Sequence, residues 1–331
     1  MLHHGGGVRR AASRHGIPAE AWLDLSTGIN PEGWPVPPPP PSSWRRLPEE
    51  GDGLESVAST YYGTDSLLAV AGSQAAIQAL PHLRPPGRVV ITAPGYAEHA
   101  IAWRRGGHRV TLAPPEEIGK QIDHHQVAVI IHPNNPTGHR FDPHTLLSWQ
   151  ERLGRRGGWL VVDEAFMDAT PEASLAPLAG RRGLVVLRSL GKFFGLAGVR
   201  VGFVCAEGGL LRALRTRLGP WAVSGPARWV ATRALADHPW HTMTREHLVA
   251  QSARLERMLG AHGLPSGGST PLFVRVVTPV AKELHQALCR RGILTRLFRA
   301  PAALRFGLPG RESEWSRLER GLEEALEEIV P

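Results

Sequence analysis

The sequence predicts an α/β fold built on a mostly parallel, seven-stranded sheet. Short runs of apolar residues recur between residues 67 and 204, and most lack apolar/polar alternation. Strands that are apolar on both sides are buried on both faces, which is typical of parallel sheets covered by helices. Helical or loop segments separate several of these runs. The expected strands are Leu67–Ala71, Val89–Ile91, Arg109–Leu112, Val127–Ile131, Trp159–Val162, Leu184–Leu187 and Val201–Val204, all of them buried.

Helical patterns flank these strands, and the last third of the chain mixes helices with short strands. The expected helices are Leu54–Tyr62, Ala75–Leu80, Ala227–Ala236, Met243–His262, Val280–Arg290 and Glu312–Ile329. The further strands are Leu272–Val276, Ile293–Arg296 and Ala303–Gly307. We therefore predict an N-terminal arm and Pro-rich connector over 1–45, a large domain over 46–225, and a smaller C-terminal α+β domain over 226–331.

The N-terminal arm offers few signals. Alternation at Leu23 and Leu25 favours a short extended piece over a loose terminus. The prolines of Pro35–Pro41 require an extended or irregular chain, and a stiff connector is favoured over a ligand for a Pro-binding module. His3-His4 precedes three glycines. This start is either a disordered segment or a tag remnant, or a flexible segment whose backbone approaches a ligand closely.

Composition narrows the class of protein. The formal net charge is +8, but the arginines are scattered and no long basic run with interleaved aromatics occurs. Nucleic-acid binding is therefore not expected, and a phosphorylated small substrate is the simpler account. We expect no membrane span, no secretion signal and no metal site, and the two cysteines, Cys205 and Cys289, fit a reducing cytoplasm.

A glycine-rich stretch between the last two strands of the predicted sheet carries the strongest chemical signal. It holds Lys192, whereas Lys120 and Lys282 lie in polar or helix-start surroundings typical of solvated lysines. Lys192 is either a surface-turn lysine or an amine that forms an imine with a carbonyl cofactor. In the second case Ser189 and Arg200 would hold the phosphate of that cofactor.

Four further segments bear on this choice. Ser73 and Gln74 follow Gly72 between a strand and a helix, where backbone N–H groups point at an anion. Tyr96 follows a strand and could stack on an aromatic ring, although packing is the commoner role. Asn135, in a heptad from His132 to Gly138, could donate to a phenolate oxygen.

Asp163 stands at the C-terminal end of a predicted strand. Ligands of parallel α/β sheets bind at this edge. A carboxylate there can keep a pyridine nitrogen protonated, which makes the ring an electron sink. The alternative is an ordinary carboxylate at a strand end.

In this order, over about residues 20–310, the segments resemble the fold-type I family of pyridoxal-phosphate enzymes, in its class I/II aminotransferase branch. The resemblance implies the fold-type I architecture, pyridoxal 5'-phosphate as cofactor, and a homodimer. Lys192 would form the imine, Asp163 would bind the pyridine nitrogen and Tyr96 would stack on the ring as the third catalytic residue. The implied cofactor-binding residues are Ser73, Gln74, Tyr96, Asn135, Asp163, Ser189, Lys192 and Arg200.

Two positions depart from the pattern of that branch. Phe166 stands where a tyrosine usually donates to the ring oxygen of the cofactor. Leu47, in Arg46-Leu47-Pro48, replaces the tyrosine expected to reach the neighbouring subunit's cofactor phosphate.

Within the branch, the sequence is similar to the threonine-phosphate decarboxylases of cobalamin biosynthesis, whose fold is that of the histidinol-phosphate aminotransferases. The similarity rests on His4–Gly6, Ser26–Pro31, Asp163–Phe166, Gly292–Arg296 and Leu304–Phe306. It implies decarboxylation of O-phospho-L-threonine, a phosphorylated amino acid, to (R)-1-amino-2-propanol phosphate. The implied substrate-binding residues are His4, Gly5, Asn30, Asn135, Arg296 and Arg305.

Three alternatives stay open at this point. Arginine binds carboxylate and phosphate bidentately, so Arg296 and Arg305 suit either group of the substrate. Amino transfer to an amino-phosphate substrate competes with decarboxylation, because the bond held perpendicular to the cofactor ring is the one that breaks. A non-catalytic descendant of the family is the third reading.

Overall fold

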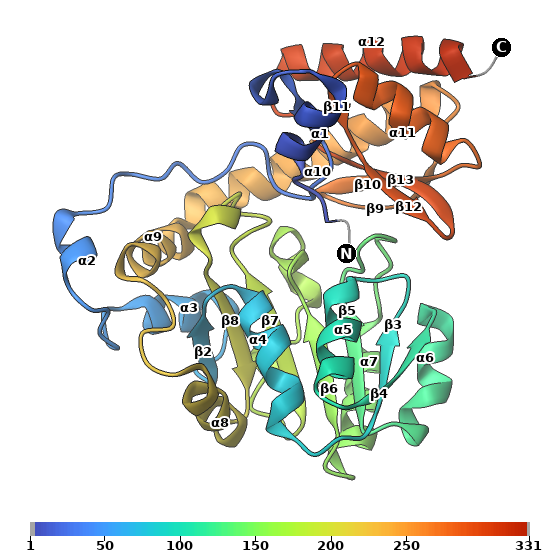
Figure 1. Ribbon diagram of the computed structural model, residues 1–331. Helices are drawn as coiled ribbons and strands as arrows, with labels where there is room; N and C mark the ends of the chain where they lie inside the picture. Colours follow the sequence, from blue (N-terminus) through green and yellow to red (C-terminus); the bar gives the residue numbers. More distant parts are fainter. Residues whose placement is uncertain (1–3, 330–331) are drawn as a thin grey trace. The chain divides into compact units, whose positions relative to one another are not determined.

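The computed structural model describes residues 4–329 (Figure 1). Contacts divide the chain into two compact units. The larger comprises residues 33–135 and 139–243, and the smaller comprises residues 136–138 with the described parts of 1–32 and 244–331. Residues 1–3 of the predicted arm and 330–331 of the predicted small domain lie outside the described residues. The predicted domain boundaries at residues 45 and 225 stay predictions.

The larger unit contains a seven-stranded sheet with the strand order β2-β8-β7-β6-β5-β3-β4. Neighbouring strands from β7 to β4 run parallel, whereas β8 runs antiparallel to both β2 and β7. The predicted mostly parallel sheet is thereby confirmed. The strands are β2 (Leu67–Val70), β3 (Arg88–Thr92), β4 (Arg109–Ala113), β5 (Val127–Ile131), β6 (Trp159–Asp163), β7 (Leu184–Ser189) and β8 (Gly202–Ala206).

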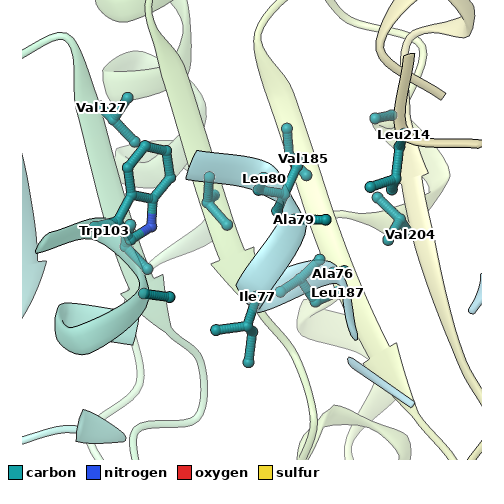
Figure 2. Packing of buried hydrophobic residues seen from close by; sticks show 14 of the residues in the cluster. Ala76, Ile77, Ala79, Leu80, Trp103, Val127, Val185, Leu187, Val204 and Leu214 are labelled. Atoms are coloured by element: carbon teal, nitrogen blue, oxygen red, sulfur yellow. The ribbon is translucent and has the colours of Figure 1, made fainter. Parts of the chain in front are cut away.

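Helices bury both faces of this sheet. On one face, Ala76 of α4 (Ser73–Ala79) lies beside Leu187 of β7, and Leu80, just after the helix, lies beside Val185 (Figure 2). Side chains on the opposite face of the sheet are also buried. Ile130 of β5, which is in register with Val186 between Val185 and Leu187, is fully buried there. The other helices of this unit are α2 (Pro41–Arg45), α3 (Leu54–Tyr62), α5 (Ala97–Arg105), α6 (Pro115–Gln121), α7 (Pro143–Gly154), α8 (Gly208–Leu218) and α9 (Gly225–Ala236).

Strand β4 contradicts the expectation that every strand of this sheet is buried. It is the last strand in the order and pairs only with β3 among the described strands. Leu112 is 50% exposed, and the neighbouring Arg109 and Thr111 are also exposed. Its apolar residues predict burial, but an edge position leaves much of each side chain in water.

The smaller unit contains a four-stranded antiparallel sheet with the order β12-β13-β10-β9. Strand β1 (Leu23–Asp24) confirms the predicted extended piece and pairs in parallel with β11 (Ile293–Leu294). The prediction missed β9 because its glycines, serines and threonine form no apolar run. The remaining strands are β9 (Ser266–Thr270), β10 (Phe273–Val277), β12 (Arg296–Arg299) and β13 (Ala302–Gly307).

The arm contains a helix that the sequence did not suggest, α1 (Val8–His15). Helix α10 (His238–Ala261) begins in the larger unit, and its residues from Thr244 belong to the smaller one. Helices α11 (Ala281–Arg290) and α12 (Glu312–Ile329) pack against each other, and α11 also contacts strand β13. Among residues 4–329, no helix has the length and apolar character needed to cross a membrane.

Because β3, β5, β6 and β7 run parallel, their carboxyl ends meet at one edge of the sheet. The residues that leave these ends include Tyr96, Asn135, Asp163 and Ser189. Parallel α/β sheets bind ligands at this edge.

The central strands should dominate the stability of the larger unit. We expect Ile130→Ala to lower the free energy of unfolding by about 2–5 kcal/mol, because Ile130 is fully buried and truncation leaves a cavity. Leu112→Ala on the exposed edge strand is the matched control and should cost at most about 0.5 kcal/mol. Urea unfolding measures both, and equal losses would contradict this assignment of the core.

Candidate active site

Asp163 ends strand β6 and is only 4% exposed. Its Oδ1 accepts a hydrogen bond of 3.1 Å from the backbone N–H of Ala165, and its Oδ2 lies 2.8 Å from Nε2 of His99. A carboxylate has about four acceptor sites, so Asp163 can accept a further N–H donor such as a protonated pyridine ring. The side chain is thus held in place from two sides.

His99 was missed by the sequence reasoning. It lies in the first turn of α5, three residues after Tyr96, and its side chain is 1% exposed. A signal existed, because a helix that starts at the carboxyl end of β3 directs its first turn toward the edge where Asp163 stands. Its ring bonds to Oδ2 of Asp163 while the Ala165 N–H bonds to Oδ1, so each carboxylate oxygen has its own partner.

Tyr96 is anchored to the start of α4. Its hydroxyl donates to Oε1 of Gln74 at 3.1 Å, and Nε2 of Gln74 lies 3.4 Å from Oε2 of Glu98. Burial, with smaller contributions from the charges of Asp163 and Glu98, raises the pKa of Tyr96 to about 12. The phenol therefore stays protonated at neutral pH, and Gln74 fixes the position of its ring.

The segment from Gly72 to Ser73 lies against Arg200 and Gly202. Gly72 has φ 71°, and a Cβ added there would stand 2.7 Å from Nη2 of Arg200. A Cβ on Gly202 would stand 2.7 Å from the backbone nitrogen of Ser73. Only glycine permits both approaches. A guanidinium and backbone N–H groups are thereby gathered in one place, which fits a phosphate group.

Lys192 follows β7 in a turn that Ser189 stabilises. The hydroxyl of Ser189 accepts a 3.2 Å hydrogen bond from the backbone N–H of Gly191. Nζ of Lys192, a half-buried residue, lies 5.4 Å from the centre of the Phe166 ring. The position where the branch usually has tyrosine is therefore beside the lysine amine. Phe166 offers its ring face to this amine but no hydroxyl.

Asn135 is partly buried in the loop that follows β5. Its neighbour Asn134 fixes this loop: Nδ2 of Asn134 donates to the carbonyl of Pro94 at 2.9 Å, and its backbone N–H donates to the carbonyl of His139. The loop that carries Asn135 is therefore tied to the segment that carries Tyr96.

A buried ion cluster joins the segments that carry Asp163 and Lys192. Arg188 of β7 bonds to Glu164 through Nη1 at 2.5 Å and to Asp168 through Nη2, and all three side chains are at most 2% exposed. Burial raises the pKa of Glu164, and the charge of Arg188 opposes that rise. Burial favours the neutral form of Arg188, but Asp168 and Glu164 outweigh it and raise its pKa well above the usual value.

In the smaller unit, Arg296 of β12 and Arg305 of β13 lie directly opposite each other. Arg305 is 6% exposed, and its Nη2 donates to the carbonyl of Ser26 at 2.8 Å. Burial, aided by the charge of Arg296 and opposed by that of Asp24, lowers the pKa of Arg305 to about 9. This cationic pair is the strongest candidate in this unit for binding an anion.

The arm residues approach the same place. A Cβ added to Gly5 would stand 2.2 Å from the carbonyl oxygen of Ser26, so the two backbones touch. The structure thus brings Gly5 and Arg305, both predicted to bind substrate, together at Ser26. His4 is exposed beside Gly5, and Asn30 is 3% exposed with its Oδ1 accepting from the backbone of Glu32.

Comparison with known proteins gives concordant matches. The family model for aminotransferase class I and II matches residues 54–328. A curated relative, threonine-phosphate decarboxylase of Pseudomonas aeruginosa, is 54% identical over 97% of this chain and 97% of its own length.

Two solved structures share the fold. Histidinol-phosphate aminotransferase of Sinorhizobium meliloti, in complex with pyridoxal-5'-phosphate, aligns with a TM-score of 0.84 at 18% identity, covering 99% of this chain and 96% of that one. L-threonine-O-3-phosphate decarboxylase of Porphyromonas gingivalis aligns with a TM-score of 0.78 at 22% identity, covering 92% and 99%. At these identities the likeness shows the fold alone, and it confirms the predicted fold-type I architecture.

The buried ion cluster allows a test of stability against pH. We expect Arg188→Met to lower the free energy of unfolding by about 3–5 kcal/mol at pH 7, because it leaves buried carboxylates without their cation. The raised pKa of Glu164 favours the neutral acid in the folded state. That contribution is fully present below the unfolded pKa of about 4.3 and is lost as pH rises through the folded value.

The penalty of Arg188→Met should therefore be smaller near pH 4 than at pH 7 in chemical denaturation. Arg156→Met is the matched control, since Arg156 pairs with the half-exposed Asp123 and its loss should cost at most about 1 kcal/mol. A penalty for Arg188→Met that is independent of pH would contradict the charge argument.

Proposed function

Because the chain belongs to the class I and II aminotransferase family, we propose that it is a pyridoxal-phosphate enzyme that decarboxylates O-phospho-L-threonine. The observation that carries this proposal is the 54% identity, over 97% of the chain, to the threonine-phosphate decarboxylase of Pseudomonas aeruginosa. The cationic pair Arg296 and Arg305 supports it, because the substrate carries a carboxylate and a phosphate. The product of this carboxy-lyase reaction is (R)-1-amino-2-propanol phosphate.

The residues of the larger unit fit the cofactor. Gly72 lets the Arg200 guanidinium approach the backbone at the start of α4, so a cation and backbone N–H groups suited to a phosphate lie together. Asp163, held by His99 and Ala165, is oriented to accept from the pyridine nitrogen. We assign the phosphate to Ser73, Gln74, Ser189 and Arg200, the ring to Tyr96, Asn135 and Asp163, and the covalent bond to Lys192.

When bound, pyridoxal phosphate supplies a conjugated ring that withdraws the electron pair left at Cα by the departing carboxylate. The residues of this chain must orient the substrate so that the bond to the carboxylate is perpendicular to that ring. We assign this task to Arg296 and Arg305, with His4, Gly5, Asn30 and Asn135 as further substrate contacts. Lys192 or a water molecule is the candidate donor of the proton that Cα receives.

The competing function is amino transfer of the histidinol-phosphate type. A histidinol-phosphate aminotransferase of Streptomyces avermitilis, 33% identical over 73% of this chain and 70% of its own length, supports it as the second candidate. An aminotransferase needs the Cα–H bond, and not the carboxylate bond, perpendicular to the ring. A modest rotation of the substrate separates the two outcomes.

We further propose a role in cobalamin biosynthesis and a cytoplasmic location, both as the family resemblance implies. The two cysteines, Cys205 and Cys289, are buried and free, which suits a reducing compartment.

We also propose a homodimer. In the larger unit Trp44 is 68% exposed, Leu47 63% and Trp221 59%, and a subunit interface would remove such apolar surface from water.

Incubation with O-phospho-L-threonine and pyridoxal phosphate should release CO₂ and form an amino-alcohol phosphate, in a ratio of one to one. The measurement follows labelled CO₂ and, in parallel, amino transfer to 2-oxoglutarate. Transfer without CO₂ release would replace decarboxylation with the aminotransferase alternative.

The control for this assay is Lys192→Ala. The wild-type protein should show a visible absorbance band from the bound cofactor, and the variant should lose that band together with CO₂ release. An unchanged band would remove Lys192 from its assigned role, and a wild-type protein without any band would refute the enzyme proposal.

Sedimentation equilibrium should report twice the mass of one chain. Trp44→Ser and Trp221→Ser should shift the equilibrium toward the single chain, since each removes a large exposed apolar side chain. Val249→Ser, a half-exposed residue of α10, is the control in the smaller unit and should leave the mass unchanged. A single-chain mass for the unmodified protein would rule out the dimer.

A further inference from the structure

Ser26 is a polar residue that the proposed reaction does not yet use. It is 2% exposed and immediately follows Leu25, whose backbone N–H donates to the carbonyl of Leu294 and whose carbonyl accepts from the N–H of Gly307. The two backbone hydrogen bonds of Leu25 therefore fix the position of Ser26 in the smaller unit. The carbonyl and the hydroxyl of Ser26 each bond to a different partner.

The carbonyl oxygen of Ser26 accepts the 2.8 Å hydrogen bond from Nη2 of Arg305. Arg305 also lies with its guanidinium carbon 5.0 Å from the centre of the Phe273 ring. Ser26 and Phe273 thus hold this guanidinium in position while Arg296, its cross-strand neighbour, keeps the region cationic.

The hydroxyl of Ser26 holds the N-terminal arm. Oγ donates to Oδ1 of Asp24 at 2.5 Å, which leaves its lone pairs for the backbone N–H of Gly6 at 2.7 Å. Asp24 also accepts from the backbone N–H of Ser26 at 2.9 Å. The direction of the hydroxyl proton is therefore set by Asp24, and Ser26 presents an acceptor to the arm.

The arm can pack this closely against Ser26 only because residue 5 has no side chain. A side chain there would meet the Ser26 carbonyl oxygen at 2.2 Å, the same atom that binds Arg305. Gly6 has φ 79°, a conformation that other residues adopt at a cost. Gly7 differs: a Cβ added there would meet only the flexible end of Arg10, at 3.5 Å.

We propose that Ser26 is a positioning residue that fastens the arm, and with it His4, beside the Arg305 guanidinium, so that both act on one anionic group of the substrate. The proposal rests on the proposed function for the identity of that substrate. Ser26 joins the two partners through opposite ends of a single residue: the carbonyl holds the arginine and the hydroxyl holds the arm. Arm docking and anion binding at Arg305 therefore reinforce each other.

The first test measures the arm directly and needs no turnover. Hydrogen exchange of the N-terminal peptide should speed up about tenfold in Ser26→Ala, because the Gly6 N–H loses its acceptor. Ser252→Ala is the matched control: Ser252 is also buried in the smaller unit and donates to the Thr270 carbonyl at 2.9 Å, far along the chain from the arm. Equal exchange of the arm in Ser26→Ala and wild type would overturn the proposal.

The second test measures the consequence for substrate. Ser26→Ala should raise KM for O-phospho-L-threonine about tenfold, the effect of one hydrogen bond of about 1.4 kcal/mol, with kcat within twofold and the cofactor absorbance unchanged. In a chain lacking residues 1–6, KM should already be raised, and Ser26→Ala should add nothing. An additive effect in the shortened chain would show that Ser26 acts without the arm.

A third pair of variants guards against misfolding of Ser26→Ala. Gly5→Ala should reproduce the fast arm exchange and the raised KM, whereas Gly7→Ala should leave both unchanged. Identical behaviour of the two glycine variants would overturn the steric argument. If CO₂ release fails in the wild type while the arm still exchanges faster in Ser26→Ala and Gly5→Ala, the proposed reaction is refuted and the fastening by Ser26 stands.

Discussion

The parallel register of β6 and β7 is the constraint on which the candidate cofactor site depends. Asp163 lies directly opposite Leu187, so the carboxylate and the Lys192 turn leave the sheet at the same edge. The backbone N–H of Glu164 donates to the carbonyl of Leu187, and Arg188 then binds Glu164 and Asp168. Glu164, which follows Asp163, and Arg188, which precedes the Lys192 turn, therefore bond β6 to β7 next to the candidate site. A shift of one residue in this register would turn the Asp163 side chain to the other face of the sheet.

The sequence predicted the fold well where burial was two-sided. Continuous apolar runs such as Val127–Ile131 are required by a sheet covered on both faces, and that strand has the predicted bounds. The pattern was less informative at the edges. An edge strand such as β4 keeps apolar residues yet is exposed, and β9 forms because β10 offers a partner, although its residues Ser266–Thr270 carry no apolar signal.

The residues of the candidate site also fall into a group that the sequence predicts and a group that it does not. Residues whose chemistry is set by a local motif, such as Asp163 at a strand end, could be read from the sequence. The pairings between distant residues could not: His99 meets the Asp163 carboxylate 64 positions away, and the Ser26 carbonyl accepts from Arg305 across 279 positions. Such pairs arise from tertiary packing, and a single sequence contains no periodic trace of them. The same holds for Arg188, which as a sequence position is only a polar residue in an apolar strand.

Three arginines lie side by side on neighbouring strands of the smaller unit, and their arrangement favours the proposed anion-binding role over a purely structural one. Arg296, Arg305 and Arg275 occupy directly opposed positions on three neighbouring strands, so two like-charge pairs lie side by side. Opposed like charges destabilise a sheet, and burial disfavours the charged form of each guanidinium. A structural role would be served as well by apolar residues, which pack without this cost. Under the proposed substrate binding, an anion that carries both a carboxylate and a phosphate would offset the repulsion among these arginines.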